Sequence, residues 1–143
     1  ILRYTDGKPI NFNDTIDKFS ANGHLSLIRL FPHNNCTTNA MDLASENGHL
    51  GIVKWLHENR TKGCTKWAMD WASINGHIDV VKFLHENRNE GCAKDAMNYA
   101  SENGHLDVIK FLHFNCKEGC TEWAMERTTR YDHSNMIKFL HLL

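Results

Sequence analysis

The sequence predicts an all-α fold, an α-solenoid of stacked helix–loop–helix repeats. The first observation is a regular spacing, because the cysteines at Cys36, Cys64, Cys92 and Cys120 stand 28 residues apart. The second is that alanine, methionine, glycine and histidine recur at equivalent places between these cysteines. The third is that the segment 86–93 between two helix pairs shows no β alternation, so no strand is expected.

One solenoid domain is predicted to cover the whole chain, 1–143. Its segments are 1–10, the end of a preceding repeat; 11–35, a divergent repeat; 36–63, 64–91 and 92–119, three regular repeats; and 120–143, a decayed C-terminal repeat. Because Ile1 to Tyr4 resembles the tail of a second helix, we expect the array to continue before residue 1.

The first helix of each repeat follows from its apolar spacing. Ala68, Met69 and Ala72 recur at i, i+1 and i+4, which places small and apolar residues on one buried stripe. The helix is expected to end at Asn75-Gly76, because glycine readily takes the left-handed conformation that terminates helices.

The second helix is expected to begin after His77 and to bury Ile78, Val81 and Leu84. Residues 86–93 carry Asn, Arg, Glu and Gly without apolar periodicity, so they are predicted to form a loop that leads to the next repeat. One such helix pair cannot enclose its own apolar face. Stability is therefore expected to come from stacking between repeats.

The segment Ala72 to Lys82, ASINGHIDVVK, resembles the turn that joins the two helices of an ankyrin repeat, and the same pattern recurs at 22–25, 47–50 and 103–106. Two features depart from the family pattern. The usual T-P-L-H opening is replaced by forms such as Trp67 to Asp70, and the 28-residue period is shorter than the usual one of about 33. The resemblance implies a binding scaffold whose projecting hairpin is reduced to a tight loop around 89–91.

The resemblance also implies that four variable rows of first-helix positions line a concave binding face. The rows are Asn39, Trp67, Asp95 and Trp123; Asp42, Asp70, Asn98 and Glu126; Leu43, Trp71, Tyr99 and Arg127; and Glu46, Ile74, Glu102 and Arg130. The predicted partner-binding residues are Trp67, Asp70, Trp71, Ile74, Asp95, Asn98, Tyr99 and Trp123. Exposed Trp and Tyr supply large contact areas in binding hot spots. The alternative is that Trp71, Tyr99 and the other aromatic residues pack between adjacent first helices.

No metal site is predicted, because the histidines and most of the cysteines form ladders along the array. Helix layers stack about 8–10 Å apart, whereas zinc ligands lie about 2.0–2.3 Å from one metal. We expect the turn histidines to bond loop backbone, and the cysteines to be small, buried, reduced thiols. A zinc site at His113, Cys116 and Cys120 is a minor alternative that lacks an obvious fourth ligand.

No catalytic residue and no cofactor are predicted, and the chain is expected not to be an enzyme. Every repeat offers the same residues at the same spacing, which argues against one unique active site. The sequence contains no glycine-rich phosphate loop, serine elbow or paired-carboxylate motif.

Charge and hydropathy limit the classes of partner. The 16 Lys and Arg residues and 17 Asp and Glu residues leave a formal net charge of -1. No apolar run approaches the roughly 20 residues of a membrane span, and no secretory segment opens the sequence, so an intracellular, cytoplasmic location is expected.

Nucleic-acid binding is a minor alternative, based on the second-helix row Arg29, Lys54, Lys82, Lys110 and Lys138. Aspartates three residues before two of these lysines favour local ion pairing instead.

The leading hypothesis is a non-enzymatic scaffold that binds a partner protein of unknown identity through the concave first-helix face. The alternative is a structural subunit or spacer within a larger assembly. The apolar ending from Phe139 to Leu143 favours that alternative, because it is either a cap or an interface.

Overall fold

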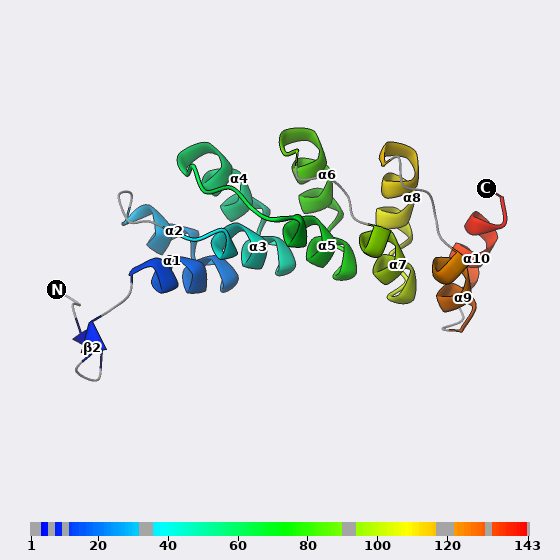
Figure 1. Cartoon of the computed structure of the whole chain (residues 1–143), viewed down its shortest axis with the longest axis horizontal. Coiled ribbons are helices and arrows are strands. Elements are labelled where there is room, and N and C mark those ends of the chain that lie inside the picture. Colours follow the sequence, from blue (N-terminus) through cyan, green and yellow to red (C-terminus); the bar gives the residue numbers. More distant parts are fainter. Residues whose placement is uncertain are drawn as a thin grey trace.

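The helices follow one another as pairs in a single row, from the N-terminal to the C-terminal end of the chain (Figure 1). The computed structural model describes residues 4–5, 8–9, 12–31, 36–89, 94–116, 122–130 and 133–142. The first helices of the pairs are α1 (Phe12–Ala21), α3 (Asn39–Glu46), α5 (Lys66–Ile74), α7 (Lys94–Glu102) and α9 (Glu122–Arg130). The second helices are α2 (Leu25–Arg29), α4 (Leu50–Asn59), α6 (Ile78–Asn87), α8 (Leu106–Asn115) and α10 (Ser134–Leu140). The predicted helical repeat solenoid is confirmed.

The turn between the two helices of a pair is set by a glycine, as the sequence predicts. Gly76 has a φ of +75°, in the left-handed region. Around it, the His77 N–H donates to the Ala72 carbonyl at 2.9 Å and the Gly76 N–H donates to the Ser73 carbonyl at 3.2 Å. These two bonds form a Schellman motif, which satisfies the last carbonyls of α5 before α6 begins.

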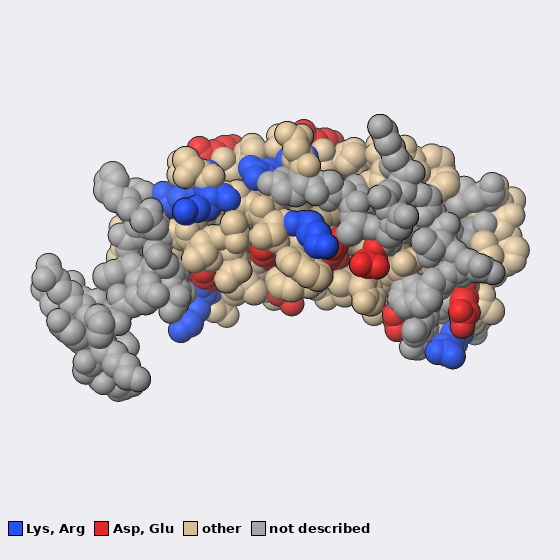
Figure 2. Space-filling model, viewed as in Figure 1, with Lys and Arg blue, Asp and Glu red and all other residues tan. Residues whose placement is uncertain are grey.

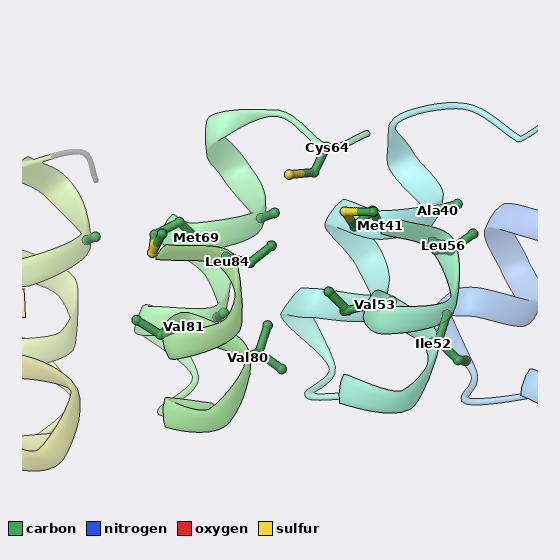
Figure 3. Packing of buried hydrophobic residues seen from close by; sticks show 14 of the residues in the cluster. Ala40, Met41, Ile52, Val53, Leu56, Cys64, Met69, Val80, Val81 and Leu84 are labelled. Carbon is green, nitrogen blue, oxygen red and sulfur yellow. The ribbon is translucent and has the colours of Figure 1, made fainter. Parts of the chain in front are cut away.

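The core lies between consecutive pairs and is made of the same residues in each repeat. First helices pack against first helices, and second helices against second helices. In Figure 3, Val80 and Leu84 point toward the preceding pair, and Met69 and Val81 point toward the following pair. The expected burial of Val81 and Leu84 is confirmed, whereas Ile78 is only partly buried and Val80 lies in the core.

Turn histidines link each pair to the one before it. The ring of His49 bonds the Ala21 carbonyl through Nε2 at 3.1 Å, and the ring of His133 bonds the Glu102 carbonyl at 2.9 Å. These bonds confirm the expected structural role of the turn histidines. The rings lie on the turn glycines, so a methyl group at Gly76 would lie 2.5 Å from Nδ1 of His105.

Buried aspartates form a second link between pairs. The Asp42 carboxylate on α3 accepts two hydrogen bonds from Thr65, one from N–H and one from Oγ1, both at 2.8 Å. Thr65 in turn caps α5, because its Oγ1 accepts the Trp67 N–H at 3.1 Å. Asp17 on α1 makes the same pair of bonds to Thr37.

The N-terminal segment differs from the prediction. Tyr4–Thr5 (β1) and Lys8–Pro9 (β2) form a short antiparallel pair, with Tyr4 opposite Pro9. The expectation of no strand is therefore wrong, and so is the placement of Tyr4 in the tail of a helix. Asp-Gly, the dipeptide between the paired segments, is typical of two-residue hairpin loops.

The connection from α4 to α5 contains no strand within residues 60–65, all of which the structure describes. This fits the expected loss of a projecting hairpin at that place. Of the loop predicted at 89–91, residues 90 and 91 lie outside the described residues.

The described cysteines of the 28-residue series form no disulfide, but a cysteine outside that series does, which corrects the prediction of reduced thiols. Cys36 and Cys64 are buried and are not disulfide-bonded. Cys116 is disulfide-bonded, and its partner lies outside the described residues. Arg60 occupies the equivalent position after α4, and there its guanidinium lies close to the Cys36 thiol.

Candidate partner-binding surface

Two tryptophans of α5 form a stacked pair on the exposed side of that helix. The Trp67 and Trp71 rings have centroids 5.8 Å apart and an interplanar angle of 28°. They are one helical turn apart, on the side opposite the buried Met69. Trp67 is 48% exposed and Trp71 is partly buried. The helix is held in place from its other side, so the pair remains open to solvent.

The neighbouring helix α7 adds a third aromatic ring and polar groups. Tyr99, at the position equivalent to Trp71, is 43% exposed. On the same helix Asp95 is exposed, and Asn98 and Glu102 are partly buried. The alternative of burial between first helices therefore does not describe Trp67 or Tyr99, whereas Trp71 is intermediate between the two interpretations.

Three further residues of the predicted rows have intermediate exposure. Ile74, Leu43 and Glu46 are all partly buried. We define the first-helix face as the accessible side chains of α3, α5 and α7 in these rows: Asn39, Leu43, Glu46, Trp67, Trp71, Ile74, Asp95, Asn98, Tyr99 and Glu102.

Asp70 lies elsewhere than the sequence suggested. Its side chain is only 2% exposed, so it is not part of the accessible surface of α5. Asp42 and Asp17, at equivalent positions, are also buried, because their carboxylates bond the threonine that starts the next pair. We therefore leave Asp70 out of the first-helix face and group it with these inter-repeat aspartates.

The last predicted contact residue, Trp123, has a side chain that lies outside the described residues. On the same helix, α9, Glu126 and Arg130 are exposed. The first-helix face is therefore built from α3, α5 and α7.

Sequence reasoning missed an exposed aromatic residue on the second helices. Phe114 on α8 is 73% exposed, and its ring meets that of Phe139 with centroids 6.4 Å apart. The equivalent positions in the two preceding repeats are Glu58 and Glu86. This change from glutamate to phenylalanine between otherwise similar repeats was the available signal.

The thiols and histidines do not form a group that could hold a metal ion within the part of the chain that the structure describes. Burial raises the pKa of the Cys36 thiol above its ordinary value, although the nearby Arg60 guanidinium opposes the rise. A protonated, buried thiol is a poor nucleophile. Cys116 of the minor zinc alternative is in a disulfide, so it has no thiolate to offer a metal in this state.

Two lysines in the basic row of the second helices make local contacts with aromatic rings. The Lys54 ammonium lies 5.8 Å from the Phe83 ring centroid, and the Lys110 ammonium lies 5.5 Å from that of Phe139. On the side shown in Figure 2, Lys and Arg side chains are interspersed with Asp and Glu and do not merge into one basic patch. This arrangement gives little support to the nucleic-acid alternative.

None of the helices in the described segments is both long enough and apolar enough to cross a membrane.

Comparison with known families gives one match. A family model described as ankyrin repeats, in three copies, matches residues 16–95 and 43–125. The two matches together extend from α1 to α9 and include every helix of the first-helix face. A search of curated proteins found no match.

Proposed function

Because the chain belongs to the ankyrin-repeat family, we propose that it is a non-enzymatic scaffold that binds a partner protein through the first-helix face. Ankyrin repeats are generally protein–protein interaction modules, which supports a binding role. The family does not identify the face or the partner, so the exposed residues must carry that part of the proposal.

The observation that carries the proposal is the exposure of the stacked Trp67 and Trp71 pair beside Tyr99. Large aromatic side chains bury about 150–250 Å² each when covered, and they dominate binding hot spots. Rigid helices hold these rings, so little conformational entropy is lost when a partner covers them. The mechanism is the presentation of a preformed surface.

The test is affinity capture from native cell extract with three forms of the chain, each checked for folding by helical circular dichroism. The forms are the wild type, a Trp67→Ala/Tyr99→Ala variant and a Phe114→Ala control that removes an exposed ring from the second helices. We expect the wild type and the control to retain a common protein. The double variant should bind that protein at least about 30-fold more weakly, the loss typical of hot-spot residues.

A retained protein that binds all three forms equally would contradict the proposal. So would a protein that is lost only with Phe114→Ala, because binding would then lie on the second helices.

A structural role within a larger assembly is the second candidate, and it is supported by exposed apolar side chains near α8 and α10. Phe114 is 73% exposed and Leu142 is 85% exposed. Exposed apolar groups of this kind mark contact surfaces when they are contiguous. Analytical ultracentrifugation of the chain and of a Phe114→Ser/Leu142→Ser variant tests this role. Concentration-dependent association that the variant lacks would favour it.

A further inference from the structure

The composition of the first-helix face indicates the chemistry of the segment that it binds. At its centre, Trp67, Trp71 and Ile74 form an apolar column along α5. Both flanking helices, α3 and α7, pack directly against α5. Any segment that covers the column must therefore also cover the accessible side chains of these two helices.

Carboxylates flank the apolar column on both sides. Glu46 on α3 and Glu102 on α7 are equivalent to Ile74, and Asp95 on α7 is equivalent to Trp67. Neighbouring helices pack about 8–10 Å apart, so these carboxylates lie about one helix spacing from the column. That distance is close to the Debye length of about 8 Å at physiological salt. The electrostatic potential of each carboxylate is therefore only partly screened at the rings.

One cation of the chain itself already lies against this surface. The Lys66 ammonium lies 5.2 Å from the centroid of the Trp67 ring, within range of a cation–π interaction. The ring can therefore accept a positive charge on its face. Among the described, accessible side chains of α3, α5 and α7, Lys66 is the cation that accompanies the three carboxylates.

The second helices show a different balance of positive and negative side chains. On α4, α6 and α8 the exposed Lys54, Lys82 and Lys110 alternate with the exposed Glu58, Asp79, Glu86 and Asp107, so positive and negative charges there are nearly equal in number. The larger excess of carboxylates over cations, beside exposed aromatic rings, is found on the first-helix face.

We infer that the first-helix face binds a positively charged segment of a partner protein, in which arginine or lysine side chains flank an apolar anchor. This inference rests on the proposed function. Arginine suits the surface best, because its planar guanidinium can stack on an indole and also pair with a carboxylate through two hydrogen bonds. Acidic segments and nucleic-acid phosphates would be repelled by the same carboxylates.

The test is selection of short random peptides displayed on phage, with the immobilised full chain as bait. The peptides enriched by the wild type are sequenced, and the best one is synthesised for measurement of its dissociation constant by fluorescence anisotropy. We expect the enriched peptides to carry net positive charge. The best one should bind the Glu46→Gln/Asp95→Asn/Glu102→Gln variant roughly tenfold more weakly, because each exposed ion pair contributes modestly.

The matched control removes three acidic residues of the second helices, as Glu58→Gln/Asp79→Asn/Glu86→Gln. Here the dissociation constant should change by less than about twofold, since these residues lie on another face. Enrichment of neutral or acidic peptides, or equal weakening by both triple variants, would overturn the inference.

A parallel selection on Trp67→Ala separates the failure of this inference from the failure of the proposed function. If peptides without basic residues are enriched by the wild type and lost on Trp67→Ala, the face binds peptides but the charge preference is wrong. If Trp67→Ala enriches the same peptides as the wild type, or if no peptide is enriched by either, both the inference and the proposed function are contradicted.

Discussion

The two sides of α5 differ in what they contact and in how much they vary between repeats. On the buried side, Ala68 and Ala72 have counterparts of the same residue type in the neighbouring repeats, and these are buried as well. On the exposed side, Trp67 corresponds to Asn39 and Asp95. One helix therefore carries a nearly constant side that faces other helices and a variable side that faces solvent.

The difference follows from the geometry of a repeat array. Each interface between pairs has the same shape, so the same close-packed residues are required in every copy. Exposed positions meet no such requirement, and they can differ without disturbing the stack. The comparison predicts that changes on the two sides will act on different quantities, the free energy of unfolding on one side and the affinity for a partner on the other.

The largest effect on stability is expected in the core, with Leu84→Ala. Leu84 is fully buried between consecutive pairs, so truncation leaves a cavity and should lower the free energy of unfolding by about 2–5 kcal/mol. Urea unfolding followed by circular dichroism measures the change. Leu142→Ala, at a highly exposed leucine, is the matched control and should change stability by less than about 0.5 kcal/mol. Similar losses in both variants would show that burial in this stack does not determine stability.

A smaller effect is expected at the turn, with Gly76→Ala. An alanine at a φ of +75° costs about 1–2 kcal/mol, and its methyl group would also displace the His105 ring. The expected total loss is about 2–3 kcal/mol, measured by urea unfolding.

Gly51→Ala is the contrasting glycine substitution, because Gly51 lies in a helix and not in the turn. Gly51 lies within α4, and the nearest atom to an added methyl group would be Cδ2 of Leu25, at 3.8 Å. This substitution should stabilise the chain by about 0.5–1 kcal/mol, because it removes the conformational freedom of glycine from a helix. The same sign for both glycine substitutions would contradict the structural account of the turn.

The fold could be predicted from the sequence because its signals are local and repeated. The helix-ending glycine after Asn75 and the 28-residue cysteine spacing both act within one repeat. Tyr4 was placed wrongly because a pair of two-residue strands leaves no periodicity, although the Asp-Gly dipeptide was a usable turn signal. The disulfide of Cys116 depends on the distance between two side chains in space, which spacing along the sequence does not give.

The proposed binding surface was predictable only in part. The positions of Trp67 and Tyr99 on the first-helix face were predicted from variation between repeats and from the family resemblance. The burial of Asp70 was not predicted, because the carboxylate of such a residue can turn toward a neighbouring repeat. A signal was present, since Asp17, Asp42 and Asp70 are the same residue type at equivalent positions of three successive pairs. Where a position keeps one residue type over several pairs, packing explains it better than partner binding, although this row changes to Asn98 and Glu126 in the next two pairs.

Asp42 and Trp67 give the most direct test of the distinction between packing positions and partner-binding positions. Both lie on first helices, in rows that the sequence assigned to one face. Asp42→Ala leaves the Thr65 N–H and hydroxyl without their acceptor, so it should lower the free energy of unfolding by about 1–3 kcal/mol. Asp42→Asn keeps one acceptor oxygen and should cost less, as the presence of Asn98 at an equivalent position suggests. Partner affinity should be unchanged in both variants under conditions where they are folded.

Trp67→Ala should show the reverse pattern, with weakened partner binding and a stability change of less than about 1 kcal/mol, because about half of its side chain is already in solvent. Urea unfolding and binding are measured on the same preparations of all three variants. If Asp42→Ala weakens binding as much as Trp67→Ala while remaining folded, the aspartate row belongs to the contact surface after all. If Trp67→Ala destabilises the chain as much as Asp42→Ala, the exposed tryptophan is a packing residue, and the two sides of the first helices are not separate in function.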